Sequence, residues 1–146
     1  MSTVMHRVMS TANRIGVGVY RRSGGRLGGR GAGGVRVLLL TVPGRRTGRA
    51  RTTPVGYFDH QGGYLVVGSG GGMEHDPDWF KNLRKAPVAM VQVGRTTFPA
   101  SARVLAGEER DTAFREVVVA QVPRFADYER KSGRTMPLAL LTPLPE

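Results

Sequence analysis

"VRVLLLTVPGRRTGRARTTPVGYF", residues 35–58, predicts two β-strands joined by a tight turn. Residues 35–42 form a nearly continuous apolar run, which is typical of a strand buried on both faces. Residues 52–58 carry the β-branched and aromatic side chains of a second strand, and glycines bound the turn between the two. This stretch therefore predicts a hairpin within a larger β-sheet.

The turn itself, "GRRTGR" at residues 44–49, is the strongest candidate for a binding site. Four arginines follow the buried strand within seven positions: Arg45, Arg46, Arg49 and Arg51. Guanidinium forks and backbone N–H groups in a glycine-bounded turn bind phosphate through charge-assisted hydrogen bonds. Four forks exceed the needs of one phosphate, so we expect a longer anion with several charges. A solvated hairpin loop is the alternative.

Other apolar runs predict further strands and set the fold class. These runs lie at residues 63–69, 88–93, 97–105 and 137–142. Strands without regular helical crossovers predict a mainly β (α+β) fold, an antiparallel barrel of about six strands with helices packed outside.

Two segments between the strands predict helices. "DPDWFKNLRKAP", residues 76–87, predicts a helix with Asp76 as its N-cap and Pro77 at its first position. Residues 108–122 predict a second helix, whose apolar face consists of Phe114, Val117, Val118 and Val122.

The N-terminal third differs in composition from the rest of the chain. We expect a basic amphipathic helix over residues 1–23, a flexible Gly/Arg-rich linker over residues 24–34 and one folded domain over residues 35–146. The apolar stripe of the helix is predicted to contain Val4, Met5, Val8, Met9, Ala12, Ile15 and Val19. Such a helix either packs on the domain or lies on an anionic membrane surface.

The net charge of +11 is unevenly distributed. Residues 1–58 contain eleven Arg and no Asp or Glu, whereas residues 59–146 contain eleven basic and eleven acidic side chains. The asymmetry favours an anionic partner, namely nucleic acid, an acidic membrane surface or a small polyanion, over a basic face kept for solubility. The chain has no cysteine, which excludes disulfides and thiolate metal sites. No apolar run approaches the roughly 18 residues of a membrane span, and no signal peptide is visible, so we expect a cytoplasmic protein.

A second glycine-rich segment follows the strand at residues 63–69. In "GSGGGMEHDPDW", residues 68–79, Gly70, Gly71 and Gly72 would let a ligand approach the backbone closely, and Ser69 adds a hydroxyl. The acidic side chains after them are not favoured as a metal site, because Asp76 is better used as a helix cap. The sequence is otherwise poor in acid–base groups, so in an enzyme a cofactor would carry the chemistry.

Taken together, "LLLTVPGRRTGRARTTPVGYF", "GSGGG", "DPDWFKNLRKAP" and the terminal "PLALL" resemble the deazaflavin-dependent nitroreductase family of actinobacteria. The resemblance covers roughly residues 35–143 and implies a split β-barrel of the flavin-reductase kind. It implies coenzyme F₄₂₀ as the cofactor, a deazaflavin with a phosphate and an oligoglutamate tail. FMN has one phosphate and no such tail, so the arginine count favours F₄₂₀.

The resemblance also assigns cofactor contacts by position. Arg46, Thr47, Gly48, Arg51 and Pro54 would contact the phosphate and tail, with Arg45 and Arg49 completing the clamp. Ser69, Gly70, Gly71 and Gly72 would lie beside the phosphate and ring, and Trp79 and Asn82 match the family's Trp-aromatic-x-Asn-Leu motif. The implied reaction is hydride transfer from the reduced deazaflavin to a conjugated acceptor.

The acceptor pocket departs from the family pattern. Nitroreductase-type members carry several tyrosines before the last strand, whereas "QVPRFADYERKSG" has Phe125 and only Tyr128, with Val122 at another of those positions. Tyr128 is therefore the one candidate for a proton donor or substrate contact. A quinone or an unsaturated ketone is at least as good an acceptor as a nitro compound.

Two other functions stay open at this point. One is a basic nucleic-acid-binding protein, although few aromatic residues are interleaved with the arginines. The other is a cofactor-binding protein without turnover. Peripheral membrane contact through the N-terminal helix is compatible with the enzyme, and a homodimer is a candidate assembly.

Overall fold

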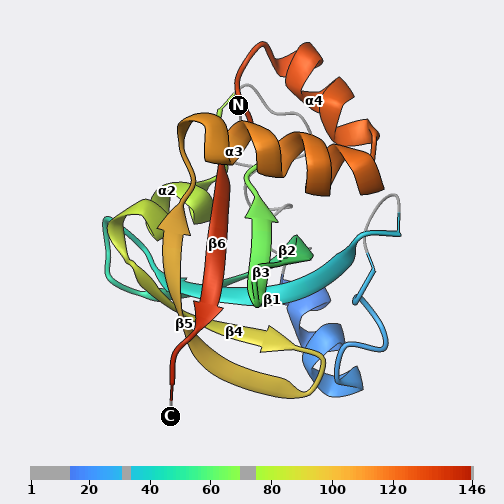
Figure 1. Cartoon of the computed structure of the whole chain (residues 1–146). Coiled ribbons are helices and arrows are strands. Elements are labelled where there is room, and N and C mark those ends of the chain that lie inside the picture. Colours follow the sequence, from blue (N-terminus) through green and yellow to red (C-terminus); the bar gives the residue numbers. More distant parts are fainter. Residues whose placement is uncertain (1–13, 31–33, 70–74, 146) are drawn as a thin grey trace.

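A computed structural model of the chain describes residues 14–30, 34–69 and 75–145. Six antiparallel strands form a closed barrel in the order β1-β2-β3-β6-β5-β4 (Figure 1). The strands are β1 (Arg36–Pro43), β2 (Ala50–His60), β3 (Gly63–Val67), β4 (Val88–Val93), β5 (Thr96–Val104) and β6 (Leu138–Pro143). The prediction of a six-stranded antiparallel barrel with peripheral helices is confirmed.

Strand β1 is buried on both faces, as its continuous apolar run predicts. Leu38 and Leu40 point into the barrel and belong to the interior core cluster. Leu39, between them, faces outward and packs against Val17 and Tyr20 of the N-terminal segment. A strand covered by the barrel interior on one side and a helix on the other has no solvated face, and this explains its lack of alternation.

A second apolar cluster lies between the outer face of the sheet and the helices after β5. Helix α3 (Gly107–Ala113) continues directly into a π-helical segment, η2 (Phe114–Val119), and α4 (Arg124–Ser132) follows after a short turn. Phe114 and Val118 are buried here, Val117 is partly buried and Val122 is buried, so the predicted helix and its apolar face are confirmed. These helices cover one end of the barrel (Figure 1).

Helix α4 was not predicted from the sequence. Its start follows Pro123, and it ends at Gly133, whose φ of 69° is the left-handed conformation that glycine adopts at helix C-termini. The Pro and Gly bounding "RFADYERKS" are the signal that would have found it.

Helix α2 (Asp78–Lys85) begins later than predicted. Its N-cap is Pro77, which makes no side-chain capping bond, so the prediction of Asp76 as N-cap is wrong. The Asp76 carboxylate instead accepts hydrogen bonds from Arg84 and Arg134. Two charge-assisted bonds to guanidinium groups are stronger than a bond to a backbone amide, and they hold this side chain away from the helix end.

The N-terminal helix also faces the barrel differently from the prediction. Residues 14–23 are helical. Ile15 and Val19, predicted on the packed stripe, are 63% and 38% exposed, whereas Val17 and Tyr20 are buried. The Tyr20 hydroxyl accepts from the backbone N–H of Gly94 at 2.9 Å, and a buried aromatic with a bonded polar end decides which side of the helix packs. The stripe positions at residues 4–12 lie outside the described residues.

A close backbone approach in β3 predicts a strong effect of one substitution. A Cβ added to Gly63 would lie 2.5 Å from the Leu141 carbonyl oxygen of the neighbouring strand, and backbone cannot move aside locally. We expect Gly63→Ala to reduce the free energy of unfolding by about 1–3 kcal/mol, measured by urea denaturation. Gly16→Ala is the control, because its Cβ meets nothing within 4 Å and alanine favours a helix. Equal stability of the two variants would contradict the prediction.

Candidate functional site

The turn between β1 and β2 has a backbone shape that depends on its two glycines. Gly44 N–H donates to the Arg49 carbonyl and Gly48 N–H to the Gly44 carbonyl, both at 2.8 Å. Gly48 has a φ of 74°, and a Cβ on Gly44 would lie 3.1 Å from the Thr47 hydroxyl and 3.2 Å from Arg51 Nε. The turn is therefore compact, and it brings the Thr47 hydroxyl and the Arg51 guanidinium onto one side.

A hollow of about 350 Å³ opens between this turn and α2. Its lining residues are Gly44, Arg45, Arg46, Thr47 and Arg51 from the turn, and Asp78, Lys81 and Asn82 from the helix. Four of these side chains are cationic and one is acidic. The arrangement suits a ligand that carries several negative charges.

Arg45 does not act as a free cation in this hollow. Its backbone N–H and its Nη1 both donate to Asn82 Oδ1, at 3.1 Å and 2.8 Å, and its Nη2 lies 3.4 Å from Asp78 Oδ1. Asn82 is only 3% exposed, so this contact is well shielded from water. Arg45 therefore attaches the turn to α2 through hydrogen bonds that Asn82 accepts.

The other cations that line the hollow are available to a ligand. Among the described residues, neither Arg46, Arg51 nor Lys81 has an ion-pair partner. Lys81 was not predicted as a site residue. It follows Asp78 by three positions and precedes Asn82, so all three lie on one side of α2, a helical spacing that could have indicated it.

The remaining predicted cofactor residues lie elsewhere. Arg49 is exposed and does not line the hollow, and Pro54 lies in β2, paired with Leu39. Trp79 is partly buried against the interior core cluster and packs edge-to-face on Phe80 at 5.3 Å. Ser69 is half-buried after β3, and Gly70, Gly71 and Gly72 lie outside the described residues.

The predicted acceptor residues Val122, Phe125 and Tyr128 all belong to the outer apolar cluster. Val122 lines a smaller hollow of about 140 Å³, together with Tyr57 and Arg36. Burial raises the pKa of the Tyr57 phenol above its usual value, so this group stays protonated at neutral pH. Phe125 is buried in the outer cluster, where it packs on Phe58 at 6.0 Å.

Tyr128 lies next to Phe125 but is less enclosed. The two rings meet edge-to-face, with centroids 5.6 Å apart and an interplanar angle of 90°. Tyr128 is partly buried, and within the described part of the chain its hydroxyl has no hydrogen-bond partner. Packing on Phe125 thus holds the Tyr128 ring, and the Tyr128 hydroxyl is available to a ligand.

Comparison with known proteins identifies the family. Residues 12–143 match the F₄₂₀H₂-dependent quinone reductase family. The chain belongs to this family. It is therefore an oxidoreductase of the deazaflavin-dependent class, with F₄₂₀ as its cofactor, and these three predictions are confirmed. Family membership favours the enzyme over the nucleic-acid-binding alternative.

Individual relatives agree with this assignment. An F₄₂₀H₂-dependent quinone reductase of Mycobacterium tuberculosis is 32% identical over 126 residues, which is 85% of this chain and 85% of that protein. The structure of an F₄₂₀-H₂-dependent reductase, FDR-A, aligns with a TM-score of 0.64 at 32% identity and covers 72% of this chain and 92% of the other. A domain-swapped dimer aligns with the same TM-score and identity, covering 72% and 78%.

Proposed function

We propose that this protein reduces a quinone with a hydride taken from reduced F₄₂₀, and that the hollow between the β1–β2 turn and α2 binds the cofactor's phosphate and glutamate tail. The observation that carries the proposal is the convergence of Arg46, Arg51 and Lys81, without ion-pair partners among the described residues, on one hollow. A family that uses this cofactor requires such a polyanion site.

The residues present fit the anionic part of the cofactor. Arg46 and Arg51 supply bidentate guanidinium forks, Lys81 supplies a point charge, and the Thr47 hydroxyl supplies a neutral donor. A single phosphate would leave part of this set unused, whereas a phosphate followed by carboxylates uses all of it. Arg45 and Asn82 fix the distance between turn and helix, so the cations are positioned before the ligand arrives.

The reduced deazaflavin, when bound, supplies an electron pair as hydride. A quinone that accepts one hydride also needs one proton to become the hydroquinone. We assign this proton to the Tyr128 phenol, directly or through water, because its ring is held by Phe125 while its hydroxyl is not used by the described protein. Val122, Phe125 and Tyr128 then form the acceptor side of the site.

The test is an anaerobic assay of the wild-type protein with F₄₂₀H₂ and a soluble naphthoquinone, followed by the fluorescence of oxidised F₄₂₀. We expect turnover with F₄₂₀H₂ and none with reduced FMN. Tyr128→Phe should lower kcat roughly a hundredfold and leave the Kd for F₄₂₀ unchanged, because general acid catalysis commonly contributes that much.

The control is Tyr64→Phe, because Tyr64 packs on Tyr57 and Phe98 in the interior cluster, away from Tyr128. Turnover of a nitro compound or enone but not of the quinone would reject the acceptor. Wild-type kcat in Tyr128→Phe would reject the proton donor.

Two partner assignments remain proposals. No helix among the described residues is long and apolar enough to cross a membrane. Exposed Ile15 and Val19 beside Arg14 and Arg22 support contact of the N-terminal helix with an anionic membrane surface, and sedimentation with anionic vesicles tests it.

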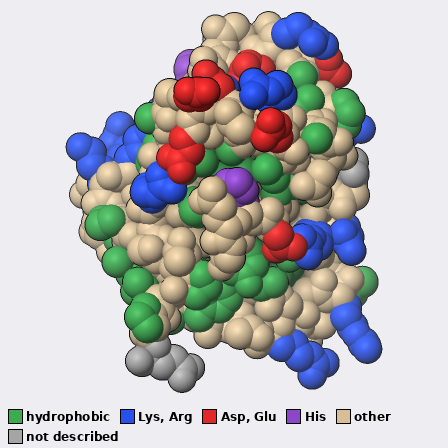
Figure 2. All heavy atoms as spheres, in the orientation of Figure 1, with side chains coloured by type: hydrophobic (Ala, Val, Ile, Leu, Met, Phe, Trp, Pro, Cys, Tyr) green, Lys and Arg blue, Asp and Glu red, His purple; other side chains and the backbone are tan. Residues whose placement is uncertain are grey.

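A homodimer is supported by an apolar outer surface on β4 and β5. Val88 and Met90 are 51% and 42% exposed there, and green side chains gather over these strands in the lower part of Figure 2, whereas acidic groups gather over the helices above. An uncharged surface is where two copies of a strongly basic protein could meet without repulsion. The mass of the protein in solution tests this assembly.

A further inference from the structure

The side-chain amide of Asn82 has an orientation that Arg45 fixes. Its Oδ1 accepts from the backbone N–H of Arg45 at 3.1 Å and from Arg45 Nη1 at 2.8 Å. An amide nitrogen carries only donors, so the atom that faces these two N–H groups is the oxygen. Arg45 therefore determines which end of the amide faces the turn, and the other end, Nδ2, is directed away from it.

The amide nitrogen of Asn82 is a donor that the described protein does not use. Among the described residues, Nδ2 has no hydrogen-bond acceptor. Asn82 is only 3% exposed, but in the described part of the chain no side-chain nitrogen or oxygen is both sealed from solvent and without a partner. Nδ2 is therefore accessible, and because Asn82 lines the hollow, this donor opens onto it. A shielded, unused donor at the wall of an anion-binding hollow suits a ligand oxygen.

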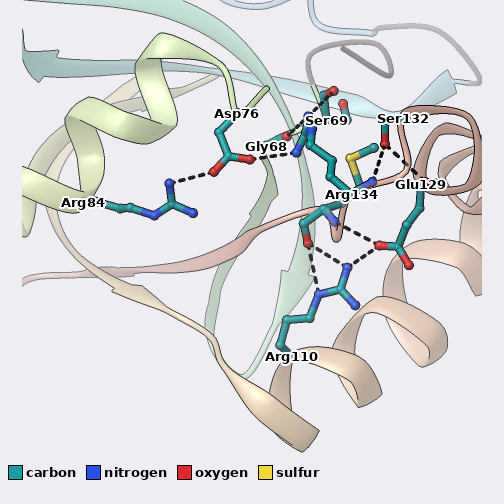
Figure 3. A network of polar contacts seen from close by, with 9 residues as sticks. Gly68, Ser69, Asp76, Arg84, Arg110, Glu129, Ser132 and Arg134 are labelled. Carbon is teal, nitrogen blue, oxygen red and sulfur yellow. Dashed lines mark hydrogen bonds and ion pairs between the residues drawn. The ribbon is translucent and has the colours of Figure 1, made fainter. Parts of the chain in front are cut away.

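Helix α2 holds Asn82 in a fixed place relative to the barrel. Its neighbours Phe80 and Leu83 are buried in the interior core cluster. At the end of the helix, Arg84 Nη1 donates to Asp76 Oδ2 at 2.7 Å (Figure 3). Neither Arg84 nor Asp76 lines the hollow, so the helix is anchored by contacts separate from the binding site.

We propose that Arg45 is a positioning residue for the cofactor site, which acts through Asn82 by orienting the amide so that Nδ2 donates to an anionic oxygen of the cofactor. The inference rests on the proposed function. It gives the arginines of the turn different tasks: Arg46 and Arg51 attract the ligand by charge, whereas Arg45 has its own counter-charge in Asp78, 3.4 Å away. A neutral donor that is oriented before the ligand arrives contributes affinity that salt does not screen.

The first measurement follows the Asn82 side-chain amide by NMR in the ¹⁵N-labelled protein, with Asn82→Asp as the variant that assigns its resonances. Inorganic pyrophosphate and γ-linked triglutamate are titrated into wild type and Arg45→Lys. We expect an anion to shift the Asn82 resonances in the wild type, and roughly threefold less in Arg45→Lys, which keeps the charge but lacks the planar fork. A shift with pyrophosphate assigns the oxygen to the phosphate, and a shift with triglutamate assigns it to the tail.

The second measurement is the Kd for oxidised F₄₂₀ at low and high salt in Arg45→Lys, Asn82→Leu and the double variant. We expect each single variant to raise Kd roughly tenfold at both salt concentrations. The double variant should bind no worse than Asn82→Leu, because Arg45 acts through the amide. Arg84→Gln is the matched control, since it removes another arginine of α2 that lies outside the lining. Its Kd should stay within about twofold of wild type.

The outcomes separate this inference from the proposed function. Losses that multiply in the double variant, or a loss that disappears at high salt, would show that Arg45 acts on the ligand by its own charge and would overturn the inference. So would an equal loss in Arg84→Gln, or Asn82 resonances that neither anion shifts. Arg45→Lys changes a side chain at the surface of the hollow, so it decides the question even where Asn82→Leu does not fold. If the wild type does not bind F₄₂₀, the proposed function fails, and the two anion titrations still decide whether Arg45 presents Asn82 to an anion.

Discussion

Replacing Arg46 or Arg51 by alanine is expected to raise the Kd for oxidised F₄₂₀ roughly tenfold to a hundredfold. A hydrogen bond to a charged group contributes about 1.5–3 kcal/mol in a partly shielded site, and each 1.4 kcal/mol is a factor of ten. Both side chains line the hollow without an ion-pair partner among the described residues, so their loss removes ligand contacts and no described contact within the protein. Fluorescence titration at moderate salt measures the effect.

Arg49→Ala is the matched control, since Arg49 belongs to the same turn and is exposed like Arg46 and Arg51, but lies outside the lining. Its Kd should stay within about threefold of wild type, because a charge outside the hollow acts on the ligand only through attraction that salt screens. The affinity for FMN, which lacks the tail, should change less than that for F₄₂₀ in Arg46→Ala and Arg51→Ala. Equal losses in all three arginine variants would indicate a general electrostatic attraction and contradict a built site.

The cationic hollow at the β1–β2 turn could be predicted from sequence, but which of its arginines are paired within the protein could not. The sequence alone shows that four arginines cluster at one turn. Which of them faces a ligand depends on α2, whose Asn82 and Asp78 occupy Arg45 from 37 and 33 positions further along the chain. The same packing adds Lys81 to the lining, a residue that only its helical spacing from Asp78 could have indicated.

The barrel itself was predictable because strand patterns are local and each hairpin turn contains glycine. The missed helix α4 carried local signals in Pro123 and Gly133, but the other two errors lie where a tertiary contact overrides a local rule. Asp76 has the sequence context of a helix cap, yet its carboxylate accepts stronger, charge-assisted hydrogen bonds from Arg84 and Arg134. The N-terminal helix exposes Ile15 and buries Tyr20, because the tyrosine hydroxyl finds backbone partners near Gly94 that are remote in sequence.

Arg110→Met is expected to be the most destabilising of the substitutions, reducing the free energy of unfolding by roughly 3 kcal/mol. Arg110 is 7% exposed; its Nε and Nη2 donate to the Met136 carbonyl at 3.0 Å and 2.7 Å, and Nη2 pairs with Glu129 at 2.6 Å. Its removal leaves the partly buried Glu129 carboxylate without its cation and the Met136 carbonyl without its side-chain donors. Thermal denaturation should show Tm lowered by about 10 °C.

Two further variants decide whether the partly buried Arg110–Glu129 ion pair is the cause. Arg110→Met combined with Glu129→Leu should recover part of the loss, since removing both charges of a buried pair costs less than removing one. Arg103→Ala should leave Tm close to wild type, because its bidentate pair with Glu109 lies in water, with side chains 55% and 44% exposed. Losses that simply add in the double variant would show that Arg110 stabilises the helices through the Met136 carbonyl or by packing over the Phe114 ring, 4.4 Å away, and not through Glu129.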